Sequence, residues 1–195
     1  AVAANEIKRR AERLDGADGV LEDAQLIREE LERCRIVLAR MAAAGGEHVG
    51  ETVEILTLEE LFSEVRARLT SDQARRWHTE SEVETIQAPR EALIQMTENI
   101  ARNGFDACEE GRVALVVRAL DEEIEMRFTD EGQGMEPQVV ARAADPFFTT
   151  KDAGDRMGLG LFLARTLVDS LGGRMQIDSI LERGTSIVVT LPQSQ

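Results

Sequence analysis

Two asparagines, Asn99 and Asn103, stand four residues apart in the stretch TENIARNGFDACEEG, and Gly104 follows the second one. Asparagine and glycine are poor helix formers, yet the spacing of apolar residues predicts a helix over 89–111. Residues four apart share a helix face. Asn103 offers a hard, neutral oxygen of the kind that Mg²⁺ accepts, and Gly104 leaves room for a ligand. A solvated asparagine pair is the alternative for this stretch taken alone.

A glycine-containing turn, DEGQGM (130–135), follows at the predicted end of a strand. Gly132 and Gly134 let the backbone turn sharply and let a flat ligand approach without a clash from a β-carbon. Asp130 is placed to accept a hydrogen bond from an exocyclic amine. An ordinary solvated Asp-Glu-Gly turn is the alternative.

A second glycine-containing segment, GDRMGLGL (154–161), opens a predicted helix. The free N–H groups at a helix start, together with the helix dipole, form an anion site. Gly158, Leu159 and Gly160 occupy this start, where glycine lets a phosphate come close. No Gly-Lys-Ser/Thr follows, so the segment is not a P-loop.

The elements that must position these residues alternate between strands and helices after residue 51. The pattern predicts strands at 52–56, 75–80, 83–88, 112–120, 123–130, 174–180 and 185–192, and helices at 58–69, 89–111, 136–143 and 159–171. Thr57 and Glu60 form a capping box at the first helix. A mostly antiparallel sheet with about three helices on one face is an α+β two-layer sandwich.

The first part of the chain has a different pattern. Residues 1–44 show apolar residues at heptad spacing on both sides of a turn, which predicts an antiparallel helical hairpin before the sandwich. Residues 45–51 are the predicted linker, and 52–195 the main domain. The apolar stripe of so short a hairpin must be covered, either by a second copy in a homodimer or by the domain's own surface.

Composition restricts the class of partner. The 195-residue chain has a net charge of −14, which argues against nucleic acid, because phosphate backbones require a surplus of Lys and Arg. Two cysteines do not make a disulfide scaffold, and a reducing cytosol is the expected compartment. The sequence shows no signal peptide and no run of apolar residues long enough to cross a bilayer.

Taken in order, the motifs resemble the N, G1, F and G2 boxes of the sensor histidine kinase catalytic domain. The matching residues are Asn99-x-x-x-Asn103, Asp130-x-Gly132-x-Gly134, PFFTTK (146–151) and Gly158-Leu159-Gly160-Leu161. The resemblance covers 52–195. It implies the Bergerat ATP-binding fold, shared with gyrase, Hsp90 and MutL, with ATP and Mg²⁺ as ligands.

The resemblance also implies roles for individual residues. Asp130 would bind the adenine amine with support from Thr185, Asn103 would hold Mg²⁺, and Asn99 would line the same side. Gly132 and Gly134 would pass under the base, and Gly158, Leu159 and Gly160 would lie at the phosphates, in a lid over 145–160. Lys151 would meet a phosphate, or else remain a mobile solvated lysine. Asp106 is a departure, since many family members carry a basic residue there.

Asn99 separates two subfamilies. ATP-hydrolysing relatives place a glutamate one turn before the Mg²⁺ asparagine to activate water, whereas an amide cannot take a proton. Glu98 is adjacent but points roughly a hundred degrees away around the helix. We therefore expect a protein-histidine kinase with no catalytic residue in this chain; a hydrolase of the same fold and a non-catalytic nucleotide-dependent scaffold remain the alternatives.

The predicted hairpin resembles the end of a dimerisation and phosphotransfer domain, which would pass a phosphoryl group to the receiver domain of a response regulator. The family expects a phosphoacceptor histidine in this domain. The chain's two histidines, His48 and His78, lack the expected sequence context, so we expect that the acceptor is missing from this sequence. We expect a fragment of a longer phosphoprotein, unable to phosphorylate itself, whose membrane anchor, if it has one, precedes residue 1. The residues around Cys34 look like those of RegB/PrrB-type kinases, which implies redox sensing; a small buried hydrophobe is the alternative.

Overall fold

The computed structural model describes residues 52–150 and 158–193. The predicted hairpin and linker, with Cys34 and His48, lie outside the described residues, and so does Lys151. Within the described ranges, no helix is both long and apolar enough to span a membrane.

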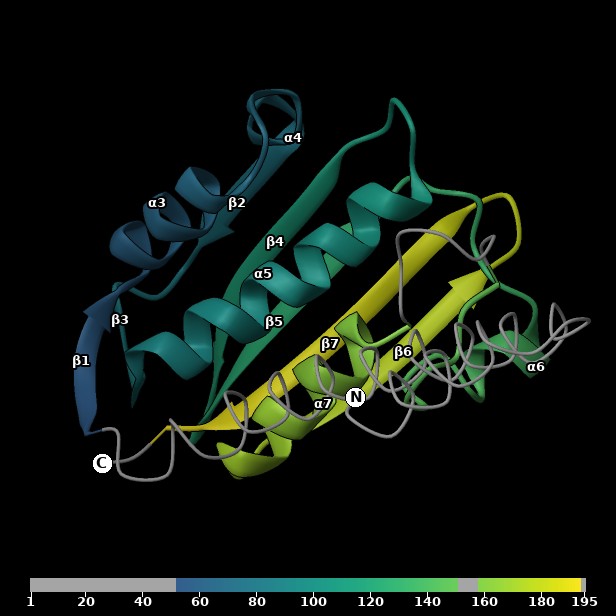
Figure 1. The fold of residues 1–195 in the computed structure, drawn as a ribbon. Helices are drawn as coiled ribbons and strands as arrows, with labels where there is room; N and C mark the ends of the chain where they lie inside the picture. Colours follow the sequence, from purple (N-terminus) through teal and green to yellow (C-terminus); the bar gives the residue numbers. More distant parts are fainter. Residues whose placement is uncertain (1–51, 151–157, 194–195) are drawn as a thin grey trace, which may run out of the picture. The chain divides into compact units, whose positions relative to one another are not determined.

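A mixed sheet forms one layer of the domain (Figure 1). Its five strands lie in the order β2-β4-β5-β7-β6, namely β2 (Trp77–Ser81), β4 (Val113–Leu120), β5 (Glu123–Asp130), β7 (Gly184–Pro192) and β6 (Arg174–Ile180). The pair β2–β4 is parallel, and the other pairs are antiparallel. The predicted hairpins at 112–130 and 174–192 are therefore confirmed.

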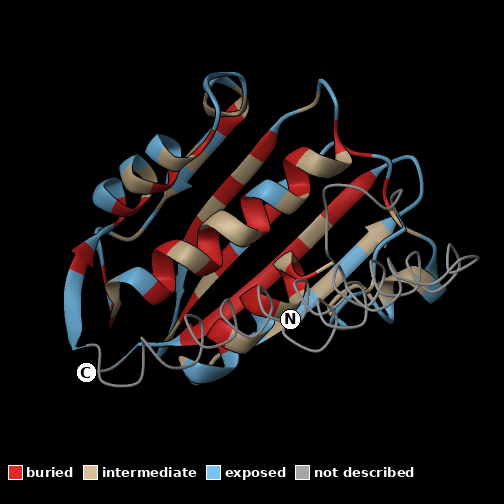
Figure 2. Cartoon of the chain, viewed as in Figure 1, coloured by how far each residue is buried: buried red, intermediate tan, exposed pale blue. Residues whose placement is uncertain are grey.

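Helices form the second layer and cover one face of this sheet (Figure 1). They are α3 (Leu58–Arg68), α5 (Arg90–Ala107) and α7 (Gly160–Ser170), with α4 (Ser71–Arg76) and α6 (Pro137–Val140) as short additions. Buried residues line α5 and the strands beneath it (Figure 2). Alternate residues of β4 and β5 face this core, as the period of a half-buried strand requires. The α+β two-layer sandwich is confirmed.

Local signals explain where the first helix begins. The hydroxyl of Thr57 accepts from the backbone N–H of Glu60 at 3.2 Å, and the carboxylate of Glu60 accepts from the N–H of Thr57 at 3.0 Å. Both bonds satisfy groups that a helix start leaves open. The predicted capping box is therefore present.

Three details differ from the sequence expectation. β1 (Val53–Thr57) pairs with β3 (Thr85–Pro89) in a separate two-stranded sheet instead of joining the main one. α4 was not predicted, although Thr70 and Gln73 form its own capping box. The helix α5 ends at Ala107, before the predicted stop at Gly111.

Candidate functional site

Asp130 is the last residue of β5 and is fixed by two backbone amides. Its Oδ1 accepts from the N–H of Gly132 at 2.9 Å and from the N–H of Thr185 at 3.2 Å. Thr185 also lies directly opposite Asp130 in the β5–β7 register. These bonds stabilise the ionised carboxylate and set its orientation.

The helix α5 packs closely against this strand end. A β-carbon built on Gly104 would lie 3.3 Å from Cβ of Asp130 and 3.2 Å from both methyl groups of Val113. The missing side chain at Gly104 therefore allows the helix to approach the sheet, and the expectation that it leaves room for a ligand is wrong, because Val113 and Asp130 occupy that space. Because Asn103 precedes Gly104, the close approach brings the asparagine helix next to Asp130.

The first glycine turn fills the space between α5 and the β6–β7 hairpin. Gly132 lies against the carbonyl of Ala107, which accepts from the N–H of Gln133 at 3.2 Å. Gly134 has a φ of +64° and lies against the carbonyl of Ile180, where a side chain would collide. Only glycine combines this backbone with this contact.

Ser179 connects three parts of the site, and sequence reasoning missed it. Its Oγ accepts from the N–H of Met135 at 2.9 Å and donates to the carbonyl of Gly184 at 3.0 Å. It also lies 3.0 Å from the hydroxyl of Thr185. A serine in an alternating strand gives no local signal of such a role, because its partners lie on other segments.

The two asparagines lie one turn apart on α5, whose Gly104 packs against the Asp130 strand end. Nδ2 of Asn99 is buried and has no hydrogen-bond partner. A buried donor without an acceptor costs about 1–3 kcal/mol. The side chain of Asn103 is half-buried and makes no hydrogen bond to any residue of 52–150 or 158–193. Asn103 is thus partly accessible to a ligand, whereas the buried Nδ2 of Asn99 lacks an acceptor.

The start of α7 completes the arrangement. Gly158 has a φ of +63° and lies against the carbonyl of Phe148, while Leu159 is buried. Leu159, which precedes the first turn, makes no side-chain capping bond, and N–H groups at a helix start suit an anion. A β-carbon built on Gly160 would lie 3.9 Å from the carbonyl oxygen of Asn99.

The amide-bearing helix therefore meets both glycine turns. Gly104 contacts the Asp130 strand end, and Gly160 contacts the backbone of Asn99. Asp130 and Gly132 thus lie against the C-terminal part of α5, and Gly160 lies beside Asn99 on the same helix.

Glu98 is held away from this region by two arginines. Its carboxylate lies 2.7 Å from Nε of Arg102 and 3.6 Å from Nη1 of Arg68 on α3. Arg102 also donates to the carbonyl of Arg68 at 2.6 Å. Glu98 is thus part of the α3–α5 contact and is not oriented as a general base for the site.

Cys108 follows α5 and is buried near Asp130. Burial raises the pKa of the Cys108 thiol, and the negative charge of Asp130 raises it further. The thiol is therefore protonated at neutral pH and is a poor nucleophile.

A family comparison agrees with this geometry. Residues 88–195 match the family described as histidine kinase-, DNA gyrase B-, and HSP90-like ATPase. The match covers more than half of the chain, so the chain belongs to this family. The family implies that the domain binds ATP.

Two curated relatives are named as kinases. The chain is 25% identical over 177 residues to sporulation kinase D of Bacillus subtilis (strain 168), covering 87% of this chain and 34% of that protein. It is 27% identical over 180 residues to sensor histidine kinase RegB of Cereibacter sphaeroides, covering 85% and 38%. The chain thus spans about a third of the length of these curated relatives. The domain is an ATPase domain of the kind found in two-component sensor kinases.

Solved structures share the fold. The mycobacterial sensor histidine kinase MprB superposes with a TM-score of 0.63 at 22% identity, over 73% of this chain and 98% of that one. ShkA, solved at full length in complex with AMPPNP, gives a TM-score of 0.71 at 21% identity, over 100% of this chain and 44% of that one.

Proposed function

We propose that this chain binds ATP together with Mg²⁺ and presents the γ-phosphate to a histidine on a helix outside the catalytic domain. The observation that carries the proposal is that an anchored aspartate, an asparagine amide without an acceptor and the start of a helix all lie along α5. These groups match the three parts of a nucleotide: a base with an amine, a metal-bearing polyphosphate and a terminal anion.

The base end of the proposed site is Asp130. An ionised carboxylate only accepts hydrogen bonds, so it suits the exocyclic amine of adenine. Guanine carries a carbonyl oxygen at the corresponding position, and two acceptors facing each other repel. Thr185 supports the aspartate through its N–H, and Gly132 and Gly134 shape the turn beside it by packing against the carbonyls of Ala107 and Ile180.

The phosphate end of the proposed site lies between α5 and α7. Gly158, Leu159 and Gly160 would present backbone N–H groups to phosphate oxygens, and Nδ2 of Asn99 would gain an acceptor. Lys151 remains a candidate phosphate contact. Asn103 would offer its oxygen to Mg²⁺, which takes its remaining ligands from water and phosphate. The described residues hold no cluster of three or more His, Cys, Asp or Glu suited to a metal, which fits an ion held largely by phosphate.

Bound Mg²⁺ would neutralise charge on the phosphates, and phosphoryl transfer needs mainly such neutralisation and positioning. The nucleophile would be a histidine nitrogen, which forms a bond to the γ-phosphorus as the bond to the β-phosphate oxygen breaks and ADP leaves. Since Glu98 is engaged by Arg102 and Arg68, activation of water by that residue is disfavoured.

The names of the relatives support a wider proposal. The full protein would be a cytoplasmic or membrane-anchored homodimer that pairs through 1–44 and passes its phosphoryl group to a response regulator. Redox control through Cys34 stays a prediction within this proposal.

Transfer can be tested by mixing the chain with a dimerisation domain that bears an acceptor histidine and with ATP labelled at the γ-phosphate. The proposal predicts acid-labile label on that domain, lost in Asn103→Ala and retained in the exposed control Asp169→Asn. ATP binding without any transfer would contradict kinase activity. Steady phosphate release that Glu98→Gln abolishes would indicate a hydrolase instead.

A further inference from the structure

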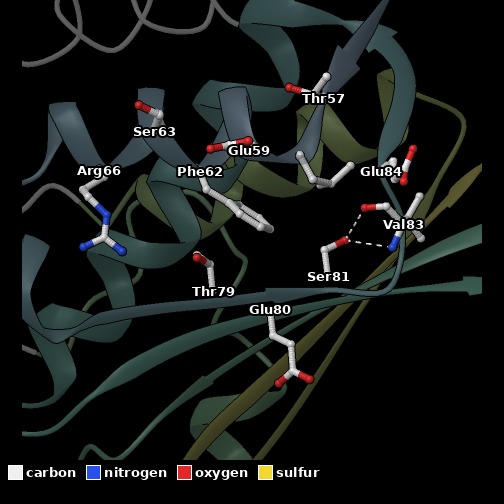
Figure 3. Close-up of a pocket in the computed structure, with 11 residues that line it drawn as sticks. Thr57, Glu59, Phe62, Ser63, Arg66, Thr79, Glu80, Ser81, Val83 and Glu84 are labelled. Atoms are coloured by element: carbon white, nitrogen blue, oxygen red, sulfur yellow. Dashed lines mark hydrogen bonds between the residues drawn. The ribbon is translucent and has the colours of Figure 1, made fainter.

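A second concave region lies away from the nucleotide site, between α3 and β2. The groove has a volume of about 730 Å³ and is lined by α3, by β2 and by the segment that leads into β3. The ring of Phe62 on α3 and the side chains of Thr79 and Ser81 on β2 point into the same space (Figure 3). This size is in the range of ligand pockets.

One wall of the groove is an unpaired strand edge. β2 is the end strand of the five-stranded sheet, with β4 on its other side. Along a strand of a parallel pair, one residue directs both its N–H and its C=O to the neighbouring strand, and the next residue directs both to the opposite side. The N–H of Glu82 donates to the carbonyl of Val117 on β4 at 3.0 Å. Thr79 and Ser81 are offset from Glu82 by an odd number of residues. They therefore direct their backbone groups away from β4 and into the groove.

Arg66 confirms this direction and closes one end. Its guanidinium donates to the carbonyl of Trp77 at 3.1 Å and to the carbonyl of Ala74 at 2.6 Å. Trp77 lies two residues before Thr79, so the backbone groups of both point to the same side of β2. At the other end, the N–H of Leu58 donates to the carbonyl of Glu84 at 3.0 Å. The stretch of α3 between these ends is about 12 Å long at 1.5 Å per residue. An extended chain of about four residues fits that length.

The charges around the groove are mainly negative. Glu59, Glu80 and Glu84 line it, although Glu80 points to the far side of β2 (Figure 3). Arg66 is the one cation among the lining residues, and its guanidinium is used by the two backbone carbonyls. The whole chain carries a net charge of −14, which disfavours a second copy as the occupant.

We propose that this groove binds a basic, extended peptide segment of a partner protein, which adds a strand to the free edge of β2. Main-chain hydrogen bonds to Thr79 and Ser81 supply the pairing, as in other strand additions. An apolar side chain of the peptide packs on Phe62, and neighbouring basic side chains meet Glu59 and Glu84. The groove uses no residue of the nucleotide site, so the proposal stands apart from ATP binding.

The test uses the whole ¹⁵N-labelled chain and an acetylated, amidated hexapeptide of alternating lysine and valine. We expect saturable shifts of the Thr79 and Ser81 amide resonances. The double variant Glu59→Gln with Glu84→Gln weakens binding about fivefold or more, as loss of two charge contacts predicts. The exposed control Asp169→Asn binds as the parent does.

Two matched peptides decide the mode of binding. A version that is N-methylated at every backbone amide cannot pair with a strand and is expected not to bind. A version with glutamate in place of lysine is expected to bind at least fivefold more weakly. The proposal is overturned if the lysine peptide gives no saturable shift at Thr79 and Ser81, or if the N-methylated peptide binds equally well. It is also overturned if the same amides shift with protein concentration alone, which would make a second copy the occupant.

Discussion

Replacing Gly104 with alanine tests how tightly the asparagine helix packs on the sheet. In an ordinary helix interior, alanine is favoured over glycine by about 1 kcal/mol. Here the new methyl group would lie 3.2 Å from both methyl groups of Val113 and 3.3 Å from Cβ of Asp130. Carbon atoms pack best at about 3.5–4.0 Å, and overpacking of this kind costs about 1–3 kcal/mol. The steric cost exceeds the helical gain, so Gly104→Ala should lose about 1 kcal/mol of stability.

Urea unfolding followed by tryptophan fluorescence is the assay. The chain has one tryptophan. Trp77 is 2% exposed, and its ring centroid lies 6.4 Å from that of Phe105, the residue after Gly104. A loss of about 1 kcal/mol corresponds to a fall in Tm of about 2–4 °C for a chain of this size.

Gly160→Ala is the matched control, because its new methyl group would lie 3.9 Å from the carbonyl oxygen of Asn99, the nearest atom among the residues that the structure describes. We expect no loss of stability there, but weaker ATP binding if phosphate approaches this glycine. Equal or greater stability of Gly104→Ala would refute the reasoning, because the helix would then not be in close contact with Val113 and Asp130.

Three further predictions concern the proposed base site and the turn beside it. Asp130→Asn should reduce the preference for ATP over GTP in competition binding, because an amide can donate to the guanine oxygen; an unchanged preference would contradict the assignment. Ser179→Ala removes the bonds to Met135 and Gly184 and should weaken ATP binding in calorimetry while Ser179→Thr restores it; equal affinity in all three proteins would show that Ser179 does not support the site. A hydrogen bond from the N–H of Arg112 lowers the pKa of Glu131. The ionised carboxylate therefore stabilises the folded protein at pH values above the usual glutamate pKa of about 4.3, and this stabilisation is lost as the pH falls. Glu131→Gln should therefore flatten the decline of urea stability below about pH 4.3, and an unchanged slope would contradict it.

Short-range signals in the sequence predicted much of this fold. The capping box of Thr57 and Glu60 marks the start of α3 because its partners lie three residues apart. The alternating strands on either side of Asp121, where φ is +45°, form the predicted hairpin. The asparagines and glycines of the candidate site could be proposed because each motif is contiguous in the chain.

The features that were missed depend on distant partners. The separate pairing of β1 with β3 joins segments about thirty residues apart, as in Leu56 opposite Ile86, and strand periodicity does not specify a partner. Helix α4 has six residues, none of them buried, so it shows no apolar periodicity. The role of Ser179 and the contact of Glu98 with Arg68 arise only when remote segments pack together.

The central claim is that the asparagine helix and two glycine turns form one pocket for a magnesium-bound nucleotide. Hydrogen–deuterium exchange measured with and without Mg²⁺ and ATP tests it most directly. The account predicts that peptides covering 99–104, 130–135 and 158–163 gain protection together, and that this gain falls sharply when EDTA removes the metal. Protection confined to one of these segments, or centred on the groove between α3 and β2, would contradict it.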